Sequence, residues 1–206
     1  MKRTDEIARL SKNNMKSAID VLTKAFWDDP LVLFFYPEEE KRKRFLPIFF
    51  EFRLKQGLRY GEVHVTSPDI VGVAIWTHSK SIESTLWRLV RSGGLNLYRV
   101  FGGALVSKMR KVDEFSSERR RRLAVTPYIH LGSFAVDPKH QGKGYASKLI
   151  RPMLQRLDEM RIHGYLETQS ESNVSLYQHY GFEVLGKGSV PDVGIPHWDM
   201  MRAPQT

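Results

Sequence analysis

The sequence Ala135–Ile150, AVDPKHQGKGYASKLI, joins the end of an apolar strand to a basic turn with two glycines and then to an amphipathic helix. Gly142 and Gly144 allow backbone conformations that other residues avoid. The helix, expected to begin near Gly144, leaves its first N–H groups without intrahelical partners, and the positive end of its dipole points the same way. The stretch therefore predicts an anion site of the kind that holds a phosphate group.

The overall composition is that of a globular protein with excess positive charge. The chain has 206 residues, 41% of them hydrophobic, and a net charge of +9, so we expect one domain, residues 1–206, whose surface attracts anions. The absence of cysteine excludes disulfides and thiolate chemistry. The longest apolar run, Leu31–Tyr36, is too short to cross a bilayer, and the N-terminus lacks the apolar core of a signal peptide. We therefore predict a cytoplasmic protein that is not in a membrane.

Hydrophobic spacing predicts the other elements of an α/β fold. Residues 82–122 indicate two or three short amphipathic helices, which form an insertion between two strands that would otherwise be neighbours. The run LVLFFYP after Pro30 is interpreted as a loop, and Gly132 as a bulge or weak point in its strand. Helices are expected at 14–26, 38–56, 144–161 and 172–180, and strands at 59–66, 70–77, 127–136, 164–170, 182–188 and 197–203. This order predicts a mixed sheet with helices on both faces.

Three kinds of phosphate-binding turn can be compared with the residues after Asp137. A Walker loop needs two glycines five residues apart followed by Lys and Ser or Thr, and no segment has that spacing. A dinucleotide-binding turn needs a third glycine where Ser147 stands, and it follows its strand directly, whereas five residues separate Val136 from Gly142. Gly142 and Gly144 fit its first two glycines, and Glu167, at the end of the next strand, matches its ribose-binding acid, so a nucleotide oxidoreductase is kept as an alternative. The third kind fits better.

Residues 141–146, QGKGYA, have the pattern Gln/Arg-x-x-Gly-x-Gly/Ala, which resembles the acyl-CoA-binding loop of the GNAT superfamily of N-acetyltransferases. A second segment, LETQSESNVSLYQHYGFE at 166–183, is similar to the strand–helix–strand that follows this loop in the superfamily. Its matching residues are Asn173, Tyr177, Gly181 and Phe182. The two motifs stand in the right order, and the resemblance covers residues 129–200.

The resemblance implies a GNAT-like, mostly antiparallel, twisted sheet, with the helical insertion before the central CoA-binding strand. It also implies acetyl-CoA as cosubstrate, with the pyrophosphate on the turn and the pantetheine arm beside strand 129–136. A bulge in that strand would aim the N–H of Phe134 or Val136 at the thioester oxygen. The implied cofactor-binding residues are Phe134, Ala135, Val136, Gln141, Gly142, Lys143, Gly144, Tyr145, Ala146, Ser147, Asn173 and Tyr177.

The resemblance assigns chemistry to a few further side chains. Tyr177 stands in the position of the general acid that protonates the leaving thiolate. Glu167 is a candidate for the general base and for substrate binding, with His130 or a water chain as the alternatives. Asp28 and Trp76 are candidates for the acceptor pocket, although helix termination explains Asp28 and a buried sheet position explains Trp76 equally well. Asn173 is either a cofactor contact or a helix-terminal residue.

The predicted function is transfer of the acetyl group of acetyl-CoA to a primary amine of a small molecule, by a monomer or homodimer. Alternatives are a protein or peptide N-acetyltransferase, a non-catalytic CoA-binding protein and a nucleic-acid-binding module. The basic runs 41–44 and 119–122 are typical of solvated helix faces and lack the interleaved aromatics of a nucleic-acid surface. No metal-ligand spacing occurs among the seven histidines, so no metal is expected.

Overall fold

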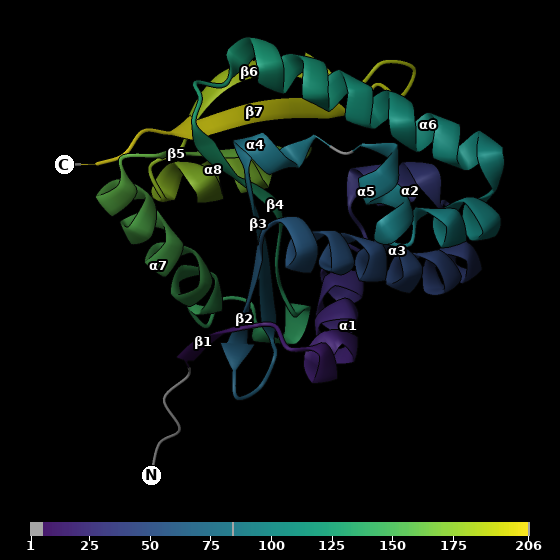
Figure 1. Ribbon diagram of the computed structural model, residues 1–206, viewed down its shortest axis with the longest axis horizontal. Helices are drawn as coiled ribbons and strands as arrows, with labels where there is room; N and C mark the ends of the chain where they lie inside the picture. The colour runs from purple at the N-terminus through teal and green to yellow at the C-terminus, as the bar shows by residue number, and fades with distance from the viewer. Residues whose placement is uncertain (1–5, 84, 206) are drawn as a thin grey trace.

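The computed structural model describes residues 6–83 and 85–205 and contains one seven-stranded sheet with helices on both faces (Figure 1). The strands lie in the order β1-β2-β3-β4-β5-β7-β6. Neighbouring strands are antiparallel except β4 and β5, which are parallel. The strands are β1 (Glu6–Arg9), β2 (Glu62–Ser67), β3 (Gly72–His78), β4 (Tyr128–Val136), β5 (His163–Thr168), β6 (Glu183–Ser189) and β7 (Pro196–Arg202). The predicted mixed, mostly antiparallel α/β fold is confirmed.

The helices bury two separate apolar layers against this sheet. They are η1 (Lys12–Asn14), α1 (Met15–Ala25), α2 (Pro30–Phe35), α3 (Glu39–Tyr60), α4 (Ser79–Ile82), α5 (Leu86–Arg91), α6 (Gly94–Leu123), η2 (Pro138–His140), α7 (Tyr145–Met160) and α8 (Glu171–His179). On one face, α7 and α8 pack on residues such as Ala74 and Leu166. On the other, α1 and α3 pack on Val73 and Ile75, and α6 runs beside β7 and β6 (Figure 1).

The predicted insertion is present between β3 and β4, which pair directly in the sheet. It forms α4, α5 and the long α6, apart from residue 84, which lies outside the described residues. Gly102 interrupts α6 with a φ of 75° and a ψ of 158°, a left-handed conformation that glycine adopts at little cost. The kink lets the second half of α6 turn back along β7.

Two segments differ from the expectation. Residues Glu6–Arg9 form an edge strand on β2, which four residues alone do not signal because the pairing partner lies far away in sequence. The run after Pro30 is a helix, α2, and not a loop. The Asp29 carboxylate accepts hydrogen bonds from the N–H groups of Leu31 and Val32 at 2.9 and 3.3 Å, and Pro30 occupies the first helical position.

No helix within the described ranges has the length and apolar character needed to span a membrane.

The parallel pair β4 and β5 separates part-way along the strands. Tyr128, Ile129 and His130 pair with His163, Gly164 and Tyr165, and the pairing stops there. Both strands continue, β4 to Val136 along β3 and β5 to Thr168 along β7. Beyond residue 130, the side of β4 that faces β5 therefore has backbone groups without a strand partner. This opening leads toward the turn before α7.

Candidate active site

The turn before α7 leaves the start of that helix open. Gly142 and Gly144 have φ values of +75° and +83°, and a Cβ built on either would meet no atom within 4 Å. Gly144 is the N-cap residue and offers no side chain to the first N–H groups of the helix. Those groups therefore face unfilled space, and the helix dipole adds positive potential there. The arrangement fits a polyphosphate, as the sequence predicted.

Side chains around the turn hold its shape and add positive charge. The Gln141 amide donates to the Val136 carbonyl oxygen at 3.1 Å, which ties the turn to the end of β4. Lys143 is exposed and donates to the Lys139 carbonyl oxygen. The Lys148 ammonium lies 5.0 Å from the Tyr145 ring centroid. On the inner side, the Ser147 and Tyr180 hydroxyls are 2.9 Å apart, so Ser147 also connects α7 to the end of α8.

The register of β4 on β3 identifies which backbone groups face the opening. The Asp137 N–H donates to the Val71 carbonyl oxygen at 2.8 Å. Since the direction of the N–H group alternates along a strand, the N–H groups of Phe134 and Val136 point away from β3, toward the β5 side. The strand also contains the expected bulge: Ser133 pairs with Ile75 and Leu131 with Trp76, so Gly132 is the extra residue.

Tyr177 of α8 lies against the opening from the α7 face. Its side chain is buried, with 8% exposed, and its ring centroid is 6.4 Å from that of Phe134. Burial, with a smaller contribution from Tyr180, raises the pKa of Tyr177 above its usual value of 10, so the phenol keeps its proton at neutral pH. Asn173, one helical turn earlier, is exposed near the start of α8, whose N-cap residue is Ser170. It is not the cap.

On the opposite face of the sheet, Glu167 of β5 forms a buried ion pair with Arg120 of α6. The Arg120 guanidinium donates to Glu167 Oε1 at 2.7 Å, and the two side chains are 7% and 14% exposed. His130 Nε2 of β4 lies 3.4 Å from Glu167 Oε2. Burial would raise the pKa of Glu167, but the hydrogen bond from His130 and the charge of Arg120 outweigh it and lower the pKa to about 2. Glu167 is therefore ionised and a weak base.

His130 has the properties of a neutral base beside the bulge. Burial lowers the pKa of His130 below its usual 6.5, and the charges of Arg120 and Arg53 oppose the support from Glu167. A carboxylate only accepts hydrogen bonds, so the ring nitrogen facing Glu167, Nε2, carries the proton and Nδ1 is left to accept one. The Nδ1 and Cε1 edge lies 3.4 Å from the position that a Cβ on Gly132 would occupy.

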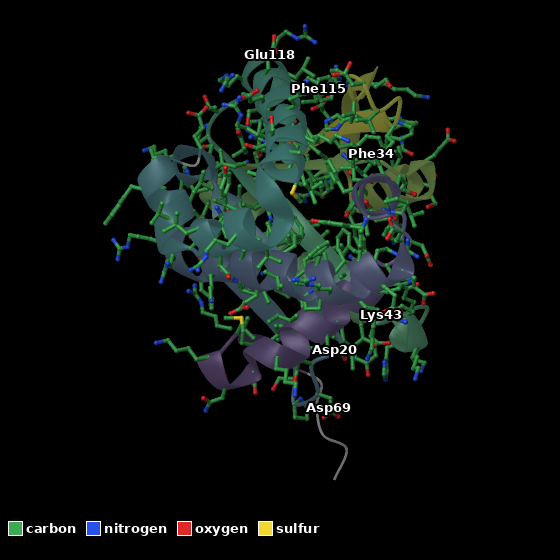
Figure 2. All side chains as sticks on the ribbon, turned by 90° about the vertical axis from the view of Figure 1, so that its right-hand side faces the viewer. Asp20, Phe34, Lys43, Asp69, Phe115 and Glu118 are labelled. Carbon is green, nitrogen blue, oxygen red and sulfur yellow. The ribbon has the colours of Figure 1, made fainter. Side chains whose placement is uncertain are left out.

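A second carboxylate continues this polar group into β7. Asp199, directly opposite Glu167 in the β5–β7 pair, accepts from Arg119 of α6 at 2.7 Å and from the Tyr165 hydroxyl at 2.7 Å. His197 Nε2 lies 3.4 Å from the same carboxylate, and its ring centroid is 5.2 Å from that of Phe115. Phe115 lies on α6 (Figure 2). Glu167, His197 and Asp199 lie close enough to share an ion. The two arginines already neutralise both carboxylates, so we assign no metal there.

The family model for the acetyltransferase (GNAT) family matches residues 34–182, well over half of the chain. The chain belongs to the acetyltransferase (GNAT) family. This GNAT acetyltransferase is 27% identical over 185 residues to an uncharacterized N-acetyltransferase of Schizosaccharomyces pombe, an alignment that covers 84% of this chain and 72% of that protein. The chain is therefore an acyltransferase, as predicted.

Two solved structures share the GNAT fold at low sequence identity. One is a Corynebacterium glutamicum protein named as a histone acetyltransferase and related acetyltransferase, with a TM-score of 0.71, 23% identity and coverage of 99% of this chain and 98% of that one. The other is a Drosophila melanogaster polyamine N-acetyltransferase that forms N-acetylagmatine, with a TM-score of 0.60, 12% identity and coverage of 97% and 99%. At these identities the likeness concerns the fold.

Two of the acceptor-pocket residues expected in this GNAT acetyltransferase lie elsewhere. Trp76 is 1% exposed and packs in the core beneath α7 on the other face of the sheet from Glu167, so it does not line an open pocket. Asp28 is exposed in the bend between α1 and α2, where its neighbour Asp29 caps α2. The bend explains why a polar residue stands at this position. Asp28 has no described contact with Glu167 or His130, so it is not part of the polar cluster beside the bulge.

The basic run 119–122 also differs from its interpretation as a solvated helix face. Arg121 and Arg122 are exposed, but Arg119 and Arg120 point into the protein and pair with the two carboxylates. The sequence contained one usable signal, because four arginines in a row occupy more than one side of a helix and at least one must face inward if α6 packs on the sheet. In the run 41–44, Arg42 donates to the carbonyl oxygens of Tyr36 and Pro37, and the other three residues are exposed.

Proposed function

We propose that this acetyltransferase moves the acetyl group of acetyl-CoA to a primary amine of a small molecule, by direct attack in a ternary complex. The observations that carry the proposal are the unpaired edge of β4 after His130 and the uncapped N-terminus of α7, which follows the end of that strand along the chain. A phosphate group fits the glycine turn, and an extended amide-containing arm fits a free strand edge.

The proposed cofactor contacts follow from this opening. Backbone groups of Gly142–Ser147, with Gln141 and Lys143 beside them, would hold the pyrophosphate. Phe134, Ala135 and Val136 would lie along the pantetheine arm, with the outward N–H of Phe134 or Val136 directed at the thioester oxygen. Asn173 and Tyr177 would contact the arm from α8, with Asn173 at its exposed end.

The chemistry requires one proton to leave the amine and one to reach the sulfur. When acetyl-CoA is bound, its thioester supplies the electrophilic carbon; the new C–N bond forms as the C–S bond breaks. We assign the base to His130, because its Nδ1 edge faces the bulge and its neutral form prevails at neutral pH. Glu167 then acts as a positioning residue that fixes the ring, in place of the base role expected from sequence. Tyr177 returns a proton to the thiolate.

Enclosure supports a small acceptor over a protein. His130 and Glu167 are largely buried, and Arg119 and Arg120 hold α6 over them. A flexible peptide would need α6 to move away, whereas a small amine needs only a local opening. The protein-acetyltransferase alternative is tested in the same experiment by including a histone-tail peptide among the acceptors.

The test combines acetyl-CoA binding with turnover. Isothermal titration should show acetyl-CoA binding to the wild type, weakened in Gly144→Val, because a β-branched residue is strained at a φ of +83°. Release of free CoA should then be measured with a panel of amines and the peptide. Binding without release from any acceptor would indicate a non-catalytic CoA-binding protein, and no binding would refute the proposal.

A further inference from the structure

Arg53 of α3 lies beside the bulge of β4 and has no part in the proposed proton transfers. Its guanidinium donates to the Gly132 carbonyl oxygen at 3.3 Å. A Cβ on Gly132 would lie 3.0 Å from Arg53 Nη2 and 3.4 Å from His130 Nδ1. Arg53 and the proposed base therefore approach one point on the bulge from two sides, and glycine at position 132 leaves room for both.

The charges around this point do not cancel. Glu167 pairs with Arg120, and Asp199 pairs with Arg119. Among residues 6–83 and 85–205, no carboxylate oxygen lies within 4.0 Å of the Arg53 guanidinium. Burial lowers the pKa of Arg53, while the more distant charges of Asp113 and Glu167 favour the protonated form. Arginine stays charged in proteins. The Arg53 guanidinium is therefore a positive group without an ionic partner beside the bulge, next to the proposed base.

We infer that Arg53 binds a carboxylate of the acceptor, so that the substrate is an amino acid whose amine and carboxylate are separated by one to three carbons. This inference rests on the proposed function and names its substrate class. The planar guanidinium of Arg53 donates one N–H group to the Gly132 carbonyl oxygen. Its other N–H groups can donate to a carboxylate oxygen. The acceptor amine, next to His130, would then be within a few bond lengths of its own carboxylate.

The same charge disfavours a polycationic acceptor. A diamine bound with one amine at His130 would place its second, protonated amine near Arg53 or Arg120, and like charges repel more strongly in a partly dry site. A plain alkylamine would leave Arg53 unpaired at the mouth of the site. The arrangement is therefore complementary to one amine with one anion.

The test uses pairs of acceptors that differ only by the carboxylate: phenylalanine and phenylethylamine, alanine and ethylamine, leucine and 3-methylbutylamine, and lysine and cadaverine. We expect the amino acid to have the higher kcat/KM in at least one pair, by about 10- to 100-fold, which is the range for a hydrogen bond to a charged group. Arg53→Met should lower that ratio at least tenfold, and Arg53→Lys should restore part of it. Arg59→Met, the same change at an exposed position on α3, should leave the ratio as it is.

Two results would overturn the inference. In one, the amine without the carboxylate is used as well as or better than the amino acid in every pair. In the other, Arg53→Met lowers both members of a pair equally, which indicates that Arg53 only supports the bulge. Titration of phenylalanine into the CoA complex keeps the two proposals separate. If an amino acid binds to the wild type and not to Arg53→Met, but no CoA is released, only the catalytic proposal is contradicted. If none of the four amino acids binds, recognition by Arg53 is contradicted.

Discussion

The ion pair between Arg120 and Glu167 should stabilise the protein more than any surface pair, and Glu167→Gln tests this. The variant leaves the Arg120 guanidinium 7% exposed and without its carboxylate. Removing one partner of a buried pair typically costs about 3–5 kcal/mol, because the other charge stays buried and uncompensated. The lowered pKa of Glu167, about 2 against an ordinary 4.5, corresponds to about 3 kcal/mol, to which the hydrogen bond from His130 and the charge of Arg120 both contribute.

The assay is urea unfolding of wild type and Glu167→Gln at pH 7, with Glu118→Gln as the matched control. Glu118 is an exposed residue on the same helix α6 (Figure 2), and its replacement should change the free energy of unfolding by less than about 0.5 kcal/mol. The double variant Arg120→Met with Glu167→Leu should be less destabilised than Glu167→Gln, because it leaves no unpaired charge. A loss below about 1 kcal/mol in Glu167→Gln would refute the picture of a dry pair.

The pH dependence has a definite sign. A carboxyl group whose folded-state pKa is depressed stabilises the protein above its unfolded pKa, and this contribution is lost as the pH falls through the folded value. For Glu167 the loss occurs between pH 4.5 and about 2. The difference in unfolding free energy between wild type and Glu167→Gln should therefore shrink as the pH falls from about 4.5 to about 2. A difference that grows on acidification would contradict the assignment.

Three further changes test the turn, the acid and the base. Tyr177→Phe should lower kcat, measured by CoA release, at least tenfold, and should change the acetyl-CoA affinity, measured by titration calorimetry, very little. Unchanged turnover at saturating amine would exclude Tyr177 as the general acid. Gly144→Ala should weaken acetyl-CoA binding about fivefold, because a left-handed conformation costs a non-glycine residue about 1 kcal/mol. Equal affinity of the variant and the wild type in a titration would show that the turn does not bind the phosphates. The pKa of His130 lies below 6.5, so kcat/KM should fall as the pH is lowered, with a midpoint below pH 6.5 where the ring gains a proton. His130→Gln should remove this acidic limb of the pH profile and lower the activity at least tenfold, and an unaltered profile would place the base elsewhere.

The backbone of the proposed CoA side of the site could be predicted from sequence because it is encoded locally. Gly142 and Gly144 need left-handed backbone, the helix after them is amphipathic, and both facts lie within a dozen residues. The bulge at Gly132 is likewise a glycine within a single strand. Backbone geometry set by glycines and apolar spacing is what short patterns specify well.

The acceptor side was much less predictable because its contacts join distant segments. Arg120 and Glu167 are 47 residues apart, and Arg119 and Asp199 are 80 apart. Hydrophobic periodicity says which face of α6 turns inward only if the helix is straight, and Gly102 breaks it. The base expected from sequence, Glu167, was a reasonable choice for a carboxylate on that strand. Its arginine partner, which makes it a weak base, comes from the insertion.

On the proposed function, the insertion sets the charge of the acceptor side. Without α6, Glu167 and Asp199 would be two unneutralised carboxylates beside the bulge, a site suited to a cationic amine. With α6 in place, Arg119 and Arg120 pair with both, and Arg53 beside the bulge has no carboxylate partner among the residues that the structure describes. On this proposal, a shared GNAT sheet can serve amines with or without a carboxylate according to the helix packed across it. If so, the residues that distinguish acceptors in such chains should be sought on the inward face of this helix and on α3, and not in the glycine turn.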